Sequence, residues 1–145
     1  MSTISAGTTT GTALVSTGDT TGNLILQAGG TNTLLTLSST TATFAKAYTE
    51  TVYALGTTGS IALNPANGTL QTCALTGNPT FTDSLSAGQS LVLMLTNGAS
   101  YTVTYPTLTW VTSAGNAAPT LTAADTLVFW KIGSTLYGAY AGSYA

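Results

Sequence analysis

Very few residues of this chain could carry acid–base or nucleophilic chemistry. Its 145 residues include four acidic side chains, two lysines and one cysteine, with no arginine and no histidine. Without histidine, neither a Ser-His-Asp nor a Cys-His arrangement can form. The same lack, beside a lone cysteine, removes the usual ligand sets for zinc. Paired carboxylates are therefore the main chemistry left to consider.

The carboxylates are Asp19, Glu50, Asp83 and Asp125. A glycoside hydrolase needs two carboxylates about 5 to 10 Å apart, and Asp83 and Asp125 could meet in a folded domain. Each lies in a turn-like sequence, TDSL or AADT, where aspartate accepts hydrogen bonds from the nearby backbone. No Asp-rich loop offers the oxygen ligands of a calcium site. We therefore expect turn-forming aspartates, no enzyme activity, no cofactor and no metal.

Charge and hydropathy argue against nucleic acid and membrane as partners and favour association with other protein chains. Two lysines cannot neutralise a phosphate backbone, so we expect no nucleic acid. The longest apolar run, Leu91–Leu95, is far shorter than the roughly 18 to 20 residues of a membrane span, and Met1-Ser2-Thr3 begins no signal peptide of the usual form. Only 4% of residues are charged and the net charge is −2. So little charge favours association, and we expect an oligomer or a part of a larger assembly.

The apolar pattern predicts an all-β protein with almost no helix, because threonine alternates with Val, Leu, Ala and Tyr. Turn signals every 8 to 12 residues suggest an antiparallel β-sandwich or jelly-roll-like domain. Gln89–Thr96 is apolar on both faces, which predicts a central strand covered on both sides. The expected strands of this domain are Thr51–Leu55, Ser60–Asn64, Thr69–Thr76, Gln89–Thr96, Tyr101–Tyr105 (antiparallel after the Asn97-Gly98 turn), Thr107–Thr112, Thr126–Ile132 and Thr135–Ala141.

A change in composition near residue 45 divides the chain into residues 1–45 and residues 46–145. The first part is rich in Thr, Gly and Ser and too poor in large apolar groups to form a core. It contains two expected strands, Asn23–Gln27 and Thr33–Leu37, joined by an AGGTN turn. Two interpretations stay open, a solvated tail or an extended attachment arm whose hairpin orders against a neighbour. On the second, the candidate capsid- or subunit-contact residues are Leu24, Ile25, Leu26, Leu34, Leu35 and Leu37.

Aromatic residues gather late in the chain, where they could line a sugar site, a subunit contact or the core. Trp130 lies on an apolar strand and is expected in the core. The candidates for a trimer interface or a glycan contact are Tyr137, Tyr140 and Tyr144. Cys73 has no partner within the chain and is expected to be a small buried hydrophobe. Repeated Thr-x-Thr pairs could order water on ice, but they follow no fixed period.

Two segments resemble virion proteins of tailed bacteriophages. The opening STISAGTTTGTALVSTGDTTGNLILQAGG, residues 2–30, is similar to a leading module of phage tail-fibre and other minor structural proteins. The stretches ALGTTGSIALNPANGTLQTCALTGNPTF, AGQSLVLMLTNGASYTVTYPTLTWV and APTLTAADTLVFWKIGSTLYGAYAG resemble a β domain of fibre and capsid-associated proteins. Its marks include Leu75–Thr80, Tyr105-Pro106, Trp110, Trp130-Lys131 and Tyr137-Gly138.

This resemblance implies a homotrimeric virion structural protein, assembled in the host cytoplasm, and brings no catalytic residue with it. Residues 31–50 leave no room for a fibre shaft between arm and β domain. We therefore expect a capsid decoration or cement protein whose arm binds the major capsid protein, another virion protein or a neighbouring copy. The alternative is a short tail-fibre or tail-associated protein that binds a host receptor glycan. A free-standing carbohydrate-binding adhesin stays open as a third reading.

Overall fold

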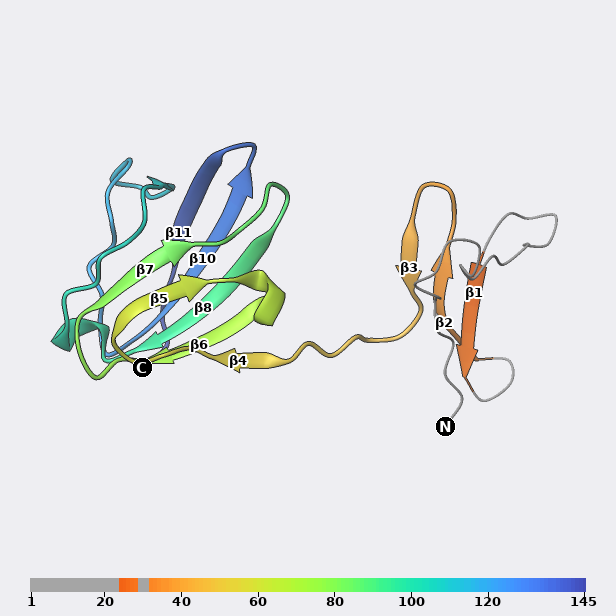
Figure 1. Ribbon diagram of the computed structural model, residues 1–145, viewed down its shortest axis with the longest axis horizontal. Coiled ribbons are helices and arrows are strands. Elements are labelled where there is room, and N and C mark those ends of the chain that lie inside the picture. Colours follow the sequence, from red (N-terminus) through yellow and green to blue (C-terminus); the bar gives the residue numbers. More distant parts are fainter. Residues whose placement is uncertain (1–23, 29–31) are drawn as a thin grey trace, which may run out of the picture. The chain divides into compact units, whose positions relative to one another are not determined.

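A computed structural model describes residues 24–28 and 32–145 of the chain (Figure 1). Contacts between residues divide the chain into two units, with the boundary in the sequence between Thr49 and Glu50. The prediction of an all-β protein is confirmed, because the described residues hold strands and only two single turns of 3-10 helix, η1 (Pro65–Asn67) and η2 (Gly98–Ser100). Three parts of the sequence prediction lie outside the described residues: the arm residues 1–22, Asn23 at the start of the first expected strand, and Gly29–Thr31 of the turn.

The first unit contains a three-stranded antiparallel sheet of β1 (Leu24–Ala28), β2 (Asn32–Leu37) and β3 (Ala42–Phe44). β1 and β2 are the two strands expected of the hairpin, and they pair antiparallel. β3 was not expected, because three residues are too few for a recognisable apolar pattern. The Ser38 hydroxyl helps to form the β2–β3 turn by accepting a 3.0 Å hydrogen bond from the Thr41 N–H.

The second unit is built from a six-stranded sheet and a two-stranded sheet. The large sheet has the order β4-β6-β8-β10-β11-β9, and the small one pairs β5 with β7. The strands of the large sheet are β4 (Val52–Ala54), β6 (Leu70–Ala74), β8 (Ser90–Thr96), β9 (Thr109–Trp110), β10 (Ala124–Ile132) and β11 (Thr135–Ser143). Those of the small sheet are β5 (Gly59–Leu63) and β7 (Pro79–Asp83).

The pairing is mixed, which corrects the antiparallel expectation. From β4 to β8 the chain alternates between the two sheets, so each strand pairs with the next but one. As a result β4, β6 and β8 run parallel, and β5 runs parallel to β7. Within the second unit, only β8, β10 and β11 form antiparallel pairs, while β9 joins β11 in parallel. The turn signals in the sequence were real, but several connect different sheets instead of the two strands of a hairpin.

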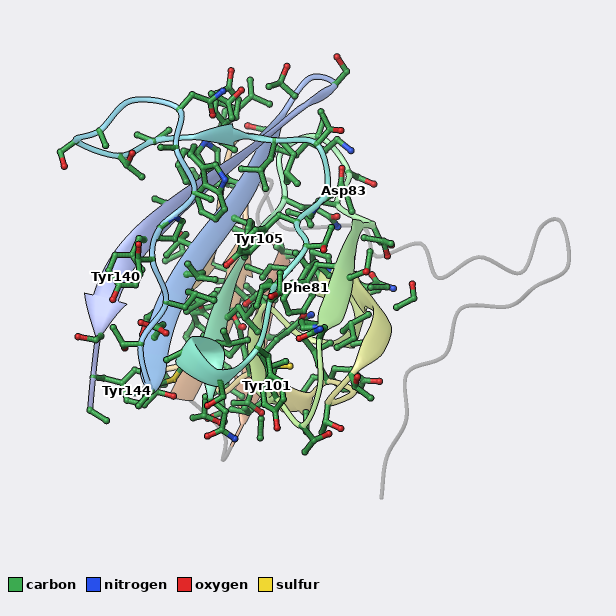
Figure 2. The ribbon with its side chains drawn as sticks, turned by 90° about the vertical axis from the view of Figure 1, so that its left-hand side faces the viewer. Phe81, Asp83, Tyr101, Tyr105, Tyr140 and Tyr144 are labelled. Atoms are coloured by element: carbon green, nitrogen blue, oxygen red, sulfur yellow. The ribbon has the colours of Figure 1, made fainter. Side chains whose placement is uncertain are left out.

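One face of the large sheet carries the core of the second unit. Its inward side chains include Leu93 and Phe129, and they pack against Leu63 and Phe81 from the small sheet. Residues of the 101–121 segment add to the same cluster, so this segment and the small sheet together cover the inner face (Figures 1 and 2). The Tyr105 ring meets that of Trp110 edge-on at 4.9 Å. The buried hydrophobic cluster lies entirely between residues 61 and 136.

Three predictions about single segments are wrong. Tyr101–Tyr105 forms no strand beside β8; Thr104 makes an isolated parallel bridge to Thr80, and the segment crosses the core as a loop. Trp130 is half-buried and stacks on Tyr137 with ring centres 5.7 Å apart, outside the core cluster. β8 is central, yet Met94 on its outer face is 39% exposed, so the strand is covered on one side only.

Candidate functional site

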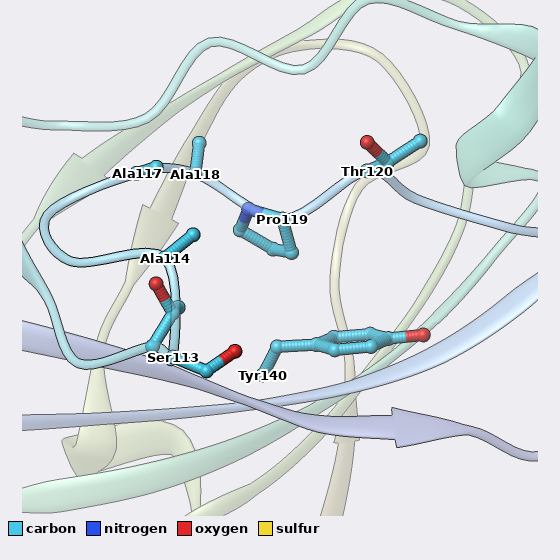
Figure 3. A pocket seen from close by; sticks show the side chains of 8 residues that line it. Ser113, Ala114, Ala117, Ala118, Pro119, Thr120 and Tyr140 are labelled. Carbon is cyan, nitrogen blue, oxygen red and sulfur yellow. The ribbon is translucent and has the colours of Figure 1, made fainter.

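A groove of about 360 Å³ opens between β11 and the 112–120 loop. Tyr140 from β11 forms one wall, and Ser113, Ala117 and Pro119 face it from the loop (Figure 3). The volume lies within the usual range of small-molecule sites, about 300 to 1,000 Å³. The full lining is Thr112, Ser113, Ala114, Ala117, Ala118, Pro119, Thr120 and Tyr140.

Tyr140 is held in place by a buried carboxylate. Its hydroxyl donates a 2.9 Å hydrogen bond to Asp125 Oδ1, and Asp125 is fully buried at the start of β10. Desolvation raises the pKa of Tyr140, and the neighbouring Asp125 carboxylate raises it further. The phenol therefore stays protonated and keeps donating at neutral pH. A fixed tyrosine ring is a preorganised surface that loses little entropy when a ligand packs against it.

Local hydrogen bonds shape the loop opposite Tyr140. The Trp110 N–H donates to Asn116 Oδ1 at 2.6 Å, and the Thr112 hydroxyl donates to the Gly115 carbonyl. Gly115 has φ of +79°, a left-handed conformation that glycine adopts without steric cost. On the β11 side, the Val111 N–H donates to the Gly138 carbonyl at 2.8 Å. The loop is thus tied to the sheet that carries the tyrosine.

The lining decides what the groove can bind. Its side chains with hydroxyl groups are Thr112, Ser113, Thr120 and Tyr140, and the others are three alanines and a proline. No charged side chain lines it. A neutral ligand with many hydroxyl groups and an apolar face, such as a sugar ring, suits this chemistry. Among the described residues, no cluster of three His, Cys, Asp or Glu could hold a metal ion.

Asp83 and Asp125 each accept a hydrogen bond from a backbone N–H two or three residues along the chain, as aspartates in turns do. Asp83 accepts from the Leu85 N–H at 2.8 Å and from the Lys131 ammonium at 2.5 Å. Asp125 accepts from the Thr122 N–H and hydroxyl at 2.8 and 2.7 Å. Asp83 and Asp125 share no hydrogen-bond partner among the described residues.

The two remaining carboxylates are Glu50 and Asp19. Glu50 accepts a hydrogen bond from the Thr69 hydroxyl at the start of the second unit. Asp19 lies outside the described residues.

The other two candidate tyrosines lie elsewhere. Tyr137 faces the opposite side of β11 from Tyr140, where it stacks on Trp130. Tyr144 is 46% exposed and lines a second groove of about 400 Å³ together with Met94 and Thr72. The three tyrosines predicted from the sequence therefore do not form one surface.

The candidate contact residues of the hairpin are largely open to solvent. Ile25 on β1 is 47% exposed, and Leu24, Leu26 and Leu34 are each 41% exposed. Leu35 and Leu37 are half-buried opposite Leu26 and Leu24 in the β1–β2 register.

Sequence reasoning missed the residues that shape the groove around Tyr140. The small side chains Ala117 and Pro119 carried no chemical signal, and Asp125 was expected only to form a turn. It also missed buried Gln71, whose amide donates to the carbonyls of Asn64 and Gly68 at 2.7 and 2.9 Å. The residues along Thr69–Thr76 alternate cleanly, and this puts Gln71 on the same strand face as Cys73. Since Cys73 was expected to be buried, the alternation could have predicted that Gln71 is buried too.

Cys73 is buried, as expected, and its thiol donates to the Gly56 carbonyl at 3.2 Å. Burial raises the pKa of this thiol, so it stays protonated at neutral pH.

No helix in the described part of the chain is long and apolar enough to cross a membrane. Comparisons with models of known protein families, with curated proteins and with solved structures gave no match.

Proposed function

We propose that this chain is a structural protein of a phage virion, most simply a capsid decoration or cement protein. In this proposal the first unit attaches the protein, and the second unit is a β-sandwich or jelly-roll-type domain displayed on the particle. The observation that carries the proposal is the separation of a small, apolar-surfaced strand unit from a domain that holds the buried core. The resemblance of both parts to phage virion proteins supports the same reading.

The first unit has the properties of an attachment element. A small sheet with exposed apolar side chains is marginally stable alone and gains stability when a partner covers it. Its outer strands β1 and β3 can pair with a strand of the major capsid protein or of a neighbouring copy. Leu24 and Leu26 lie on one face of this sheet and Ile25 and Leu34 on the other, so a partner that covers one face buries two exposed halves, which contributes about 1 kcal/mol each, or about 2 kcal/mol per copy.

Truncation tests the attachment role. Residues 46–145 keep the whole buried core, so they should fold, while losing the ability to sediment with virions. The full chain should sediment with the same particles. A milder variant carries Ile25→Ser and Leu26→Ser, with Thr82→Ser on exposed β7 as the control. Undiminished binding of residues 46–145 would contradict the proposal.

The Tyr140 groove supports a second candidate, a short tail-fibre or tail-associated protein that binds a host glycan. The uncharged, hydroxyl-rich lining against a fixed aromatic ring suits a neutral saccharide. Screening the full chain on an array of neutral and acidic glycans tests it directly. Tyr140→Ala should abolish binding of a neutral glycan, and Tyr137→Ala on the opposite face of β11 should not. A screen without any bound glycan would remove this candidate.

A further inference from the structure

A continuous apolar row crosses the outer face of the six-stranded sheet, between rows that also carry Thr and Ser side chains. We use "outer face" for the side chains of this sheet that point away from the core cluster. In the paired registers, Val52 lies beside Leu70, Leu70 beside Val92, and Val92 beside Val128. Val52 is 57% exposed, and Leu70 and Met94 are 41% and 39% exposed. The apolar members of the outer face include Val52, Ala54, Leu70, Ala74, Val92, Met94, Val128, Trp130, Ile132, Tyr137 and Ala139, and Thr72, Ser90, Thr96 and Thr126 add hydroxyl groups to it.

The open face includes the parallel part of the sheet. All-parallel sheets are normally covered on both faces, and in this mixed sheet β4, β6 and β8 are parallel. The small sheet and the 101–121 segment cover only the inner face. A contiguous apolar surface of this kind marks an interaction site in most soluble proteins.

The outer face carries no charged side chain. The charged residues of the second unit all make contacts elsewhere: Asp83 pairs with Lys131, Asp125 is buried on the core side, and Glu50 bonds Thr69. A partner must therefore present an uncharged, apolar surface too, since a charge opposite this face would be buried without a counter-ion. The chain's own outer face meets that requirement.

The size of the face is sufficient for a specific contact. Six strands about 4.8 Å apart span about 24 Å, and strands of seven to nine residues extend about 23 to 30 Å. Because the edge strands are short, the projected area is roughly 500 Å². Two such faces together reach the roughly 1,000 Å² that a biological interface should clear. The stacked pair of Trp130 and Tyr137 supplies the aromatic anchors that dominate many interfaces.

We propose that copies of this chain associate through the outer face of the six-stranded sheet. This assigns a surface to the self-association part of the proposed function. Two sheets related by a two-fold axis would bury the same residues on both copies. The contact forms in solution without a virion, so its failure would leave the attachment role of the first unit standing.

The test compares the mass of the full chain with that of single-charge variants. Light scattering after size exclusion at micromolar concentration should give a multiple of the 14.5 kDa chain mass. Met94→Lys places an unpaired charge in the middle of the interface and should weaken association at least about 100-fold, leaving a monomer. Val52→Lys, at the far more exposed edge strand, should weaken it in the same direction. Thr82→Lys, exposed on the small sheet, should keep the wild-type mass.

Near-ultraviolet circular dichroism of each variant verifies that the core around Trp110 is intact. An unchanged oligomer in both Met94→Lys and Val52→Lys would overturn the proposal. A monomeric wild-type chain would overturn it as well.

Discussion

Removing the Asp125 carboxylate should destabilise the second unit and loosen the groove together. In Asp125→Ala, three donors lose their acceptor: the Thr122 N–H, the Thr122 hydroxyl and the Tyr140 hydroxyl. Hydrogen bonds to a charged group contribute about 1.5 to 3 kcal/mol each. Thr122 and Tyr140 are only half-buried, so water can replace part of the loss. The Thr122 hydroxyl also has the Ala124 carbonyl within 3.3 Å. We therefore expect a net cost of about 3 kcal/mol in the free energy of unfolding.

Urea unfolding followed by tryptophan fluorescence measures this cost at a fixed protein concentration. With a slope of about 1.5 kcal/mol per molar urea, the midpoint should fall by about 2 M. Asp125→Asn is the matched control. Its amide oxygen can still accept from the Thr122 N–H, and its amide nitrogen can donate to the Thr122 and Tyr140 hydroxyls once these rotate to accept. It should cost about 1 kcal/mol. Equal midpoints for Asp125→Ala and the wild type would refute the view that this carboxylate anchors β11 and the 122 turn.

Three further substitutions test the packing and titration of the core. Tyr105→Phe should leave stability at pH 7 unchanged or slightly higher, because the buried Tyr105 hydroxyl has no hydrogen-bond partner. Desolvation, and then the Asp125 charge, raise the pKa of Tyr105 in the folded state. The wild-type chain therefore keeps its full stability below pH about 10 and loses stability above it, because unfolding lets this phenol ionise. The variant lacks that loss and should unfold at a higher alkaline pH than the wild type. An unchanged alkaline midpoint would argue against this. Gly138→Ala should lower stability by about 1 to 3 kcal/mol, since its Cβ would lie 3.0 Å from Trp110 Cζ3, and a thermal melt with an unaltered midpoint would contradict it. Phe129→Ala, at the centre of the core, should cost about 3 to 5 kcal/mol in urea unfolding, and a loss below 1 kcal/mol would place the core elsewhere.

The strands themselves were predictable where alternation was clean. The alternation along Thr69–Thr76 divides its side chains between two faces, and the structure buries the face that holds Gln71, Cys73 and Leu75. The pairing was not predictable, because alternation reports the face of a side chain and not the neighbour of a strand. A tight turn such as Asn64–Asn67 looks the same whether the next strand stays in the sheet or crosses to another.

The candidate site was predictable only in part, and for a similar reason. Tyr140 could be named from its aromatic chemistry, but the groove depends on a loop of small residues between Thr112 and Thr120. Trp130 was misplaced because Thr126–Ile132 is apolar on both faces. The sequence gives no means of telling a strand face covered by the chain from one left open. The outer face was difficult to recognise from the sequence because its apolar side chains give the same pattern as side chains that face the core.

Immunogold labelling of purified phage particles tests the central claim most directly. The antibody is raised against residues 50–145, the unit that the proposal places outward on the particle. We predict dense label spread over the capsid surface. Label confined to the tail would move the protein to the tail-fibre alternative and make the Tyr140 groove the first receptor site to test. Particles that carry the full chain in no detectable amount would contradict the account of this protein as a virion component.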